Sequence, residues 1–353
     1  MAEIILEPTA QSKVIPLSLR LNDTDTSLVS QLVTNRQFNT ADTDAWFSFT
    51  LEGLAATTGT FDLTLINLHD KSVFNHTDKV FNTNPFYYKL DSGTDELTKE
   101  IFLFYNFMDL DNEKNVFYLH YVKSGDNGKT WSQPVDITSQ IAKSDWKNDF
   151  KFITSGTGVY TSTGKMLHCL VNLKRGLYVF GSDDHGKSWY FIDTPITPAD
   201  ESKIVELADG SWMINSRVNN GKGMRHVHIS TDEGKTWKSR PEPALIDPSC
   251  NGSIIRYTSI KEGYNKNRLL FSNAKMEKGR KNMTVRISYD EGATWSEGKT
   301  IYPGSSAYSC LTILKNGDIG LFFEKEEYTE NPYVSFSLDW LTDGKDKFKK
   351  AKK

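Results

Sequence analysis

One eight-residue pattern, Ser-x-Asp-x-Gly-x-(Thr/Ser)-Trp, occurs four times in the chain and constrains its fold more than any other feature. The copies read SGDNGKTW, SDDHGKSW, STDEGKTW and SYDEGATW, and they begin at residues 124, 182, 230 and 288. Successive copies are therefore 58, 48 and 58 residues apart. Near-regular recurrence at this interval is typical of propellers, in which each repeat is one four-stranded blade.

Each copy has the composition of a tight turn. Asp accepts hydrogen bonds from nearby backbone N–H groups, Gly adopts conformations that a Cβ forbids, and the Trp can pack between sheets. The runs before the four copies, NVFYLHYV, RGLYVFG, MRHVHI and MTVRI, are rich in β-branched and aromatic residues, as strands are. The sequence therefore predicts four hairpin turns in an all-β fold. Because the Asp recurs once per blade, we assign it a structural rather than a catalytic role.

Composition excludes several functional classes. The net charge of -3 provides no basic field for a phosphate backbone, so we expect no nucleic-acid partner. The three cysteines, Cys169, Cys250 and Cys310, are too scattered for a disulfide framework and form no Cys-x-x-Cys pair. We therefore expect no metal and no cofactor. No run of about 18 apolar residues is present, so membrane insertion is not expected.

The first twenty residues lack the basic start and apolar run of a secretory signal. We therefore expect the chain to be made in the cytoplasm. An extracellular role would depend on transport by a virion or on an export signal that this sequence lacks.

The organisation along the chain is uneven. Residues 1–95 contain no copy of the turn motif, but VIPLSLRL, DAWFSFTL, TFDLTLINL and PFYYKL alternate apolar and polar residues, which predicts a small antiparallel sandwich. The polar stretch at 90–100 is the predicted boundary. Residues 96–345 form the predicted propeller, and residues 346–353 form a basic tail that we expect to be frayed.

The segments between the four turn motifs resemble the bacterial exo-sialidase (neuraminidase) family, whose repeats are called Asp boxes or BNR repeats. The resemblance covers about residues 98–345. It implies an all-β, sialidase-type β-propeller of five or six four-stranded blades, which the small β-rich N-terminal region would precede.

The first segment that carries the resemblance is ESKIVELADGSWMINSR, residues 201–217. Sialidases have a similar stretch with a Glu at its start and an Arg sixteen residues later. The resemblance implies that Glu201 is the base that activates a tyrosine nucleophile. It also implies that Arg217 is one of three arginines that bind the carboxylate of the substrate.

Two further segments complete the resemblance. Arg280, which precedes the fourth turn motif, matches a second carboxylate-binding arginine. In AYSCLTILKNGDIGLFFE, residues 307–324, Tyr308 matches the nucleophile and Glu324 matches the residue that holds the remaining arginine.

The chemistry explains why these residue types would be gathered. Sialic acid has a carboxylate on its anomeric carbon, and arginine forks bind carboxylates bidentately. A carboxylate nucleophile would be repelled by that group, whereas a tyrosine is neutral until a neighbouring Glu takes its proton. Sialidases with a tyrosine nucleophile are a known exception to the scheme of two catalytic carboxylates. The implied reaction is therefore retaining, through a covalent glycosyl-tyrosine.

The sequence departs from the family in its first blade. Sialidases have their first arginine there, in an Arg-Ile-Pro stretch, and an aspartate that serves as general acid. Here VIPLSLR has Val14 in the position of the arginine, and no aspartate has a matching context. We assign no role to the nearby charged residues Arg20, Arg36, Asp42 and Asp44.

Residues 1–95 loosely resemble the β-rich attachment domains of phage baseplate proteins. This implies a prophage origin, with phage structural proteins as partners. A degenerate first blade and an unrelated lectin-like sandwich are the alternatives.

Three functions follow from these observations. The first is an exo-α-sialidase that hydrolyses terminal sialic acid on glycoconjugates. The second is a non-catalytic glycan-binding propeller, such as a receptor-binding protein of a phage tail. In both, the partner is a sialylated or other acidic glycan. The third is a structural propeller without a sugar site.

Overall fold

The computed structural model of the chain describes residues 100–109, 112–126 and 128–349 in full, together with the backbone of six strands before residue 100. Two compact units are present. One comprises Met1–Lys79 with Thr329–Tyr333, and the other comprises Val80–Tyr328 with Val334–Lys353.

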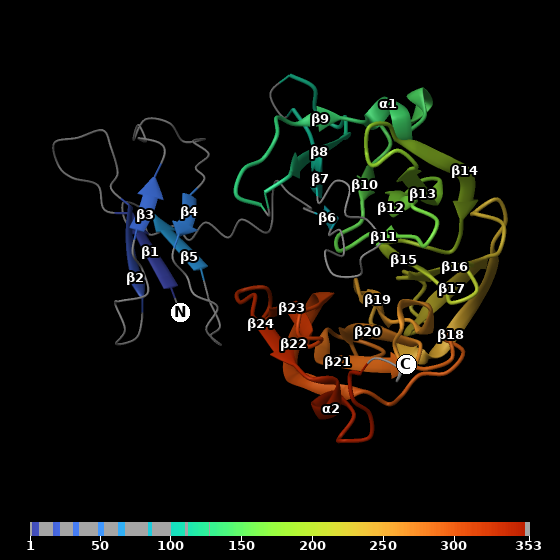
Figure 1. Cartoon of the computed structure of the whole chain (residues 1–353). Coiled ribbons are helices and arrows are strands. Elements are labelled where there is room, and N and C mark those ends of the chain that lie inside the picture. The colour runs from blue at the N-terminus through green and yellow to red at the C-terminus, as the bar shows by residue number, and fades with distance from the viewer. Residues whose placement is uncertain are drawn as a thin grey trace. The chain divides into compact units, whose positions relative to one another are not determined.

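The first unit contains two small sheets (Figure 1). Its strands are β1 Ala2–Leu6, β2 Leu17–Leu21, β3 Gln31–Thr34, β4 Phe49–Glu52 and β5 Leu63–Asn67. One sheet has the order β2-β1-β5 and the other pairs β3 with β4. The alternating sequences VIPLSLRL and TFDLTLINL each contain one of these strands, as predicted, and DAWFSFTL contains all of β4 except its last residue, Glu52. The pairing of β1 with β5 is parallel, which differs from the antiparallel sandwich that we expected.

A parallel pair needs a long connection, and the segment between β1 and β5 contains three other strands. Alternation within single strands indicates which residues share a face, but it does not indicate the direction of a partner that is distant in sequence. The attachment module and the degenerate blade both stay predictions. The predicted boundary at residue 95 lies outside the described residues.

The second unit contains the predicted propeller. Its sheets follow one another around a centre in chain order (Figure 1). The first two are formed by β6 Asn84–Phe86, β7 Ile101–Phe107, β8 Tyr118–Ser124 and β9 Val135–Asp136, and by β10 Lys151–Ile153, β11 Val159–Tyr160, β12 Met166–Asn172, β13 Gly176–Ser182 and β14 Tyr190–Ile196. β6 falls in the predicted N-terminal region, but it pairs with β7 and is the first strand of this blade.

The later sheets continue the same order. They are formed by β15 Ser202–Glu206, β16 Trp212–Ser216, β17 Met224–Ser230 and β18 Lys238–Ile246, and by β19 Ser253–Thr258, β20 Arg268–Ala274, β21 Lys281–Ser288, β22 Lys299–Ile313, β23 Ile319–Lys325 and β24 Tyr333–Phe336. The all-β propeller is therefore confirmed. The helices α1 Thr138–Ile141 and α2 Leu338–Leu341 and the 3-10 turns Ser144–Trp146 and Ile260–Glu262 are short. No helix in the described part of the chain has the length and apolarity to cross a bilayer.

β22 belongs to two blades. Its first half pairs with β21, and its second half, from Ser306 onward, pairs with β23. The last sheet therefore contains a four-stranded blade, β19–β22, followed by a three-stranded one, β22–β24. The pairing register of β22 shifts between Ser306 and Ser309, at the point where the strand passes from one blade to the next.

The four turn motifs lie between the third and fourth strands of four successive blades, and their hydrogen bonds are the same in each. In the third copy, the Ser230 hydroxyl donates to Asp232 Oδ1 over 2.8 Å, and Gly234 N–H donates to Ser230 Oγ over 2.7 Å. Thr236 donates to the same carboxylate through its backbone N–H (2.9 Å) and its hydroxyl (2.6 Å). These donors lower the pKa of Asp232 to about 2. The structural role of the repeated Asp is confirmed.

Asp184→Ala is expected to lower the free energy of unfolding by about 1–2 kcal/mol, because Asp184 accepts three hydrogen bonds at the edge of solvent, from Ser182 and twice from Ser188. Urea denaturation measures the loss. Asp184→Asn should recover part of it, since the amide oxygen still accepts. Equal losses in the two variants would contradict the role of the acceptor.

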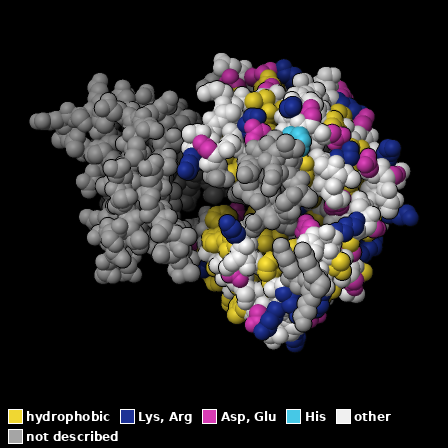
Figure 2. Space-filling model, viewed as in Figure 1, with side chains coloured by type: hydrophobic (Ala, Val, Ile, Leu, Met, Phe, Trp, Pro, Cys, Tyr) yellow, Lys and Arg dark blue, Asp and Glu magenta, His cyan; other side chains and the backbone are white. Residues whose placement is uncertain are grey.

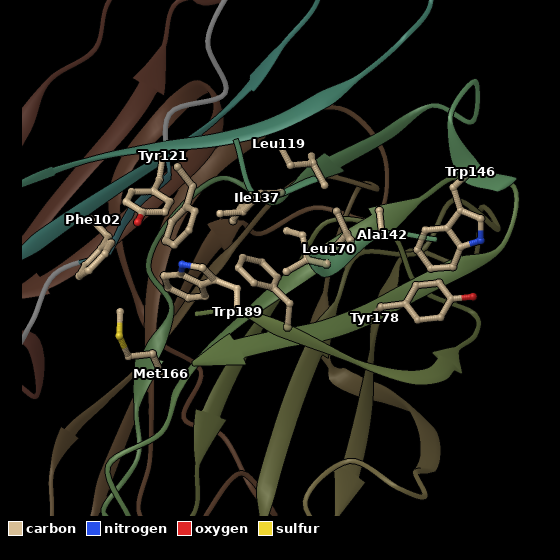
Figure 3. Packing of buried hydrophobic residues seen from close by; sticks show 14 residues of the cluster. Phe102, Leu119, Tyr121, Ile137, Ala142, Trp146, Met166, Leu170, Tyr178 and Trp189 are labelled. Atoms are coloured by element: carbon tan, nitrogen blue, oxygen red, sulfur yellow. The ribbon is translucent and has the colours of Figure 1, made fainter. Parts of the chain in front are cut away.

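Aromatic packing joins the first two blades (Figure 3). Trp189, the last residue of the second turn motif, is 5% exposed, and its ring centroid lies 5.7 Å from that of Phe102 and 5.1 Å from that of Phe104. The Trp of this motif therefore packs between sheets, as predicted. Trp131 of the first motif is 42% exposed and does not.

The predicted basic tail differs from expectation at its start. Asp346 is buried and binds the fully buried Arg268 through Nε (2.7 Å) and Nη2 (2.8 Å). Phe348 packs against Tyr257 at 5.6 Å between ring centroids. A buried arginine requires a counter-charge, and Asp346 provides it, so this part of the tail is anchored.

Basic and acidic side chains are interspersed on the face of the propeller that is visible in Figure 2. This mixture agrees with the small net charge of -3.

Candidate active site

Glu201 and Arg217 lie opposite each other at the open end of the hairpin β15–β16. Arg217 N–H donates to the Glu201 carbonyl oxygen over 3.0 Å, which continues the ladder beyond both strands. At the closed end Asp209 and Gly210 form the turn, in which Gly210 has φ +93°, a conformation that favours glycine. The hairpin thus brings together two residues that are sixteen positions apart in the sequence.

Tyr308, on β22, contacts both of these residues. Its hydroxyl donates to Glu201 Oε2 over 2.6 Å. Arg217 Nη1 donates to the same Glu201 oxygen over 2.5 Å and to Tyr308 Oη over 3.3 Å. The three side chains therefore meet around one carboxylate oxygen. The Glu201 side chain is 4% exposed and that of Arg217 is 18% exposed, so the carboxylate is nearly dry while the arginine reaches solvent.

The Tyr308 hydroxyl is a neutral donor in this arrangement. Burial raises its pKa, and the charge of Glu201 and the hydrogen bond to it raise the pKa further, whereas Arg217 acts in the opposite direction. At neutral pH the proton therefore resides on Tyr308, next to an acceptor oxygen. A buried tyrosine that can lose its proton only to one adjacent carboxylate has the geometry of a nucleophile with its general base.

Arg280 approaches Tyr308 from another blade, in the connection between β20 and β21. Its Cζ lies 5.8 Å from the centroid of the Tyr308 ring. Its Nη1 donates to Tyr328 Oη over 2.7 Å and its Nη2 donates to the Ser249 carbonyl over 3.4 Å. Two guanidinium groups thus flank one tyrosine, and this arrangement can bind an anion beside the hydroxyl.

Glu324, on β23, accepts a hydrogen bond from the backbone N–H of Tyr308 over 3.0 Å. It therefore supports the strand that carries Tyr308. Its predicted contact with a third arginine stays a prediction. Arg20 lies on β2, whose side chains are outside the described part, and Val14, Arg36, Asp42 and Asp44 are outside it as well.

Sequence reasoning missed two residues that hold Arg217. Asn219 Oδ1 accepts from Arg217 Nε over 3.0 Å, and Asn219 Nδ2 donates to Asp200 Oδ2 over 2.5 Å. Asp200 Oδ2 also lies 3.7 Å from Arg217 Nε, and Asp200 Oδ1 accepts from Glu201 N–H over 2.8 Å. The sequence could have indicated both residues by their positions. Asp200 directly precedes Glu201, and Asn219 lies two residues after Arg217.

Tyr328 was also missed, because it lies outside every motif. Its ring is 41% exposed, and it follows Glu326 and Glu327 in a run of three residues with positive φ, from +48° to +73°. Such a run is unfavourable for side chains with a Cβ, and the backbone of the turn is held by Ser305, which accepts from Glu326 N–H over 3.1 Å. The turn places the Tyr328 hydroxyl on Arg280.

No group of three or more His, Cys, Asp or Glu side chains that could hold a metal is found among residues with described placement. Tyr308, Glu201 and the two arginines can act on a substrate without a metal: they can bind an anion, move a proton and supply an oxygen nucleophile.

Comparisons with known proteins identify the family and the fold. A family model described as a BNR repeat-like domain matches residues 66–321. A sialidase of Micromonospora viridifaciens is 35% identical over 241 residues, which are 65% of this chain and 36% of that protein. A sialidase of Bacteroides fragilis is 34% identical over 211 residues, 57% of this chain and 38% of that protein.

Solved structures of a sialidase and of a trans-sialidase also match this chain. The intramolecular trans-sialidase of Ruminococcus gnavus superimposes with a TM-score of 0.52 at 26% identity and covers 64% of this chain and 51% of its own. The Hadza microbial sialidase Hz136 has a TM-score of 0.65 at 24% identity and covers 74% of this chain and 53% of its own, which bears on the fold alone. The chain spans little more than a third of the length of the two sialidases compared by sequence. It belongs to the BNR repeat-like domain family, and these relatives confirm its resemblance to the bacterial exo-sialidases.

Proposed function

We propose that the chain is an exo-α-sialidase that hydrolyses terminal sialic acid from glycoconjugates by a retaining mechanism. The observation that carries the proposal is the 2.6 Å hydrogen bond from the Tyr308 hydroxyl to Glu201, in a buried position with Arg217 and Arg280 on either side. The names of the sialidase relatives support the substrate class.

In the first step, Glu201 Oε2 takes the proton of Tyr308 as the phenolic oxygen bonds to the anomeric carbon. The bond from that carbon to the leaving-group oxygen breaks, and this oxygen takes a proton from solvent water. Tyr308 approaches as a neutral phenol and loses its proton to Glu201 as its bond to the carbon forms. In the covalent intermediate the Glu201 carboxyl and the phenolic oxygen are both neutral, so the attacking group is not a fixed anion that the carboxylate of the substrate would repel.

In the second step, water attacks the anomeric carbon and releases one proton to the solvent as the carbon–Tyr308 bond breaks. The phenolic oxygen recovers the proton that Glu201 holds. Two displacements at one carbon give net retention of configuration.

Arg217 and Arg280 would bind the carboxylate of the substrate. Arg217 has its Nη1 on Glu201 and its Nε on Asn219, so Asp200 and Asn219 orient its fork. Opposite charges raise the pKa of Arg217 although burial alone would lower it, and the group remains a cation. A charge-assisted hydrogen bond from each arginine contributes about 1.5–3 kcal/mol to binding.

A fluorogenic sialoside tests the proposal. The expected result is turnover by the full chain, with α-configured sialic acid as the first product in an NMR time course. Release of the β-anomer first would contradict the retaining mechanism, and absence of turnover would overturn the enzymatic proposal.

A non-catalytic glycan-binding propeller is the second candidate. Its support is that the two arginines beside Tyr308 suffice to bind an acidic sugar, while no general acid has been assigned in the described part of the chain. Binding to a glycan array without turnover would favour this function. Binding to no acidic glycan would exclude both candidates.

Tyr328→Phe is expected to raise KM about fivefold with little change in kcat, because it removes the hydroxyl that orients Arg280 (2.7 Å) and leaves the ring in place. Steady-state kinetics with the fluorogenic sialoside measure both constants. Tyr118→Phe removes the hydroxyl of another hydrogen-bonded tyrosine, on β8, and should leave KM unchanged. A fall in kcat with constant KM would show that Tyr328 acts on the chemical step instead.

A further inference from the structure

Ser249 lies in the connection between the blade β15–β18 and the blade β19–β22, and its backbone is left-handed. Its φ is +60°, in a region that residues with a Cβ rarely adopt. The residue belongs to the turn from Asp247 to Cys250, which follows β18 and precedes β19. A residue in such a conformation persists only where the surrounding contacts hold it, and residues of this kind cluster at functional sites.

The contacts of Ser249 reach the surroundings of both arginines of the candidate site. Its hydroxyl donates to the carbonyl oxygen of Val218 over 2.9 Å, and Val218 directly follows Arg217. Its own carbonyl oxygen accepts a hydrogen bond from Arg280 Nη2 over 3.4 Å. Arg217 comes from the blade before the connection, and Arg280 comes from the blade after it. One residue therefore joins the backbone at Arg217 to the guanidinium group of Arg280.

A buried ion pair holds the turn in place. Asp247 Oδ1 accepts a hydrogen bond from Cys250 N–H over 3.0 Å, and Asp247 N–H donates to the Gly223 carbonyl oxygen over 2.9 Å. Arg225 Nη1 donates to the Cys250 carbonyl oxygen over 2.6 Å and to Asp247 Oδ2 over 3.3 Å. The backbone is therefore fixed on both sides of Ser249.

The same arginine ties the turn to the strand that leads to Arg217. Arg225 Nε donates to Asn215 Oδ1 over 2.7 Å, and its Nη2 donates to the Asn215 carbonyl oxygen over 3.2 Å. Asn215 lies on β16, two residues before Arg217. The turn thus contacts this strand and its continuation at two points, through Arg225 at Asn215 and through the Ser249 hydroxyl at Val218.

We infer that Ser249 is a positioning residue that sets the separation between Arg217 and Arg280, and with it the fit of the two arginines to one carboxylate. Guanidinium groups bind a carboxylate in a fixed planar geometry, so a change in their separation weakens these contacts more than other contacts of a sugar. The inference rests on the proposed function for its ligand. Its physical part, the restraint of Arg280 by the Ser249 turn, is independent of any sugar.

Binding of free sialic acid and of its methyl ester tests the inference. In Ser249→Ala and in Ser249→Gly, the Kd of the acid in an NMR titration is expected to rise about three- to tenfold, because the turn loses one hydrogen bond to the strand of Arg217. The Kd of the neutral ester should change by less than twofold. In turnover, the same loss should raise KM with little change in kcat. Equal weakening of both ligands would overturn the inference.

The two variants separate positioning from stability. Glycine adopts a φ of +60° without strain, so Ser249→Gly should melt at a higher temperature than Ser249→Ala. It should nevertheless bind the acid at least as weakly, because a glycine also makes the turn more flexible. Affinity that rose and fell with the melting temperature would show that Ser249 only supports the fold, and would overturn the inference.

Ser132 provides the matched control. It follows the first turn motif, and its hydroxyl also donates to a backbone carbonyl oxygen, that of Gln133, over 2.9 Å. Ser132→Ala therefore removes a bond of the same chemistry from another blade. Its affinity for the acid should equal that of the unmodified chain, and a loss as large as that of Ser249→Ala would contradict a specific action of Ser249.

Side-chain NMR separates this inference from the proposed function. The heteronuclear NOE of Arg280 Nε, assigned with Arg280→Lys, reports the order of this side chain without a ligand. It should fall in both Ser249 variants and stay unchanged in Ser132→Ala. An unchanged value in the Ser249 variants would overturn the inference, whatever the chain binds. A fall in a chain that binds no acidic sugar would sink the proposed function and leave the restraint by Ser249 in place.

Discussion

Tyr308→Phe is expected to reduce the turnover of a fluorogenic sialoside by about a thousandfold or more, because it removes the oxygen that, in the proposed mechanism, attacks the anomeric carbon. The ring remains, so the contact with Arg280 at 5.8 Å is kept. Glu201 loses one donor but retains Arg217 at 2.5 Å, so the fold should be unaffected. Binding of a sialic acid analogue, measured by calorimetry, should change by less than tenfold.

A tyrosine–carboxylate pair outside the site gives the control for this variant. The Tyr190 hydroxyl donates to Asp183 Oδ1 over 2.8 Å beside the second turn motif. Tyr190→Phe removes a contact of the same chemistry and should retain normal turnover. If Tyr308→Phe retained more than a tenth of the activity, the role of Tyr308 as nucleophile would be wrong.

Asp247→Ala is expected to lower the free energy of unfolding by about 3–5 kcal/mol, because it leaves a buried arginine without its counter-charge. The side chains of Arg225 and Asp247 are 0% and 1% exposed and lie 3.3 Å apart. Asp247 Oδ2 also accepts from Asn273 Nδ2 over 3.0 Å, and Oδ1 accepts from Cys250 N–H over 3.0 Å. Three groups therefore lose a partner together.

Urea denaturation at pH 7 measures this loss. Asp193→Ala breaks the exposed pair between Lys143 and Asp193, at 2.7 Å, and should leave the stability nearly unchanged. The Asp247 variant should also bind an acidic sugar less tightly, since the turn that follows Asp247 places the Ser249 carbonyl on Arg280. A loss below 1 kcal/mol would mean that water or backbone groups replace Asp247.

The blades could be predicted from sequence because each turn motif determines its own structure. The side chains of Ser230, Asp232 and Thr236 form their motif hydrogen bonds within seven residues, so the turn does not depend on distant parts of the chain. The strands of the first unit were located by alternation in the same local way. The parallel pairing of β1 with β5 was not, since it depends on a partner some sixty residues away.

The candidate site was reached by resemblance. Tyr308 and Glu201 are 107 residues apart, and no local pattern indicates that blades far apart in the chain meet at a centre. For the same reason Tyr328 escaped detection, since it contacts Arg280, which lies 48 residues earlier in the chain.

The passage of β22 through two blades has a consequence for how this chain can change. Arg280 immediately precedes β21, which pairs with the first half of β22, and Tyr308 lies in the second half. Tyr308 is therefore joined to the blade of Arg280 by one continuous strand without an intervening loop. A residue inserted between Ser305 and Tyr308 would turn the hydroxyl to the opposite side of the strand. Insertions and deletions in proteins that descend from this one should therefore occur in the connections between other strands and not between Ser305 and Tyr308.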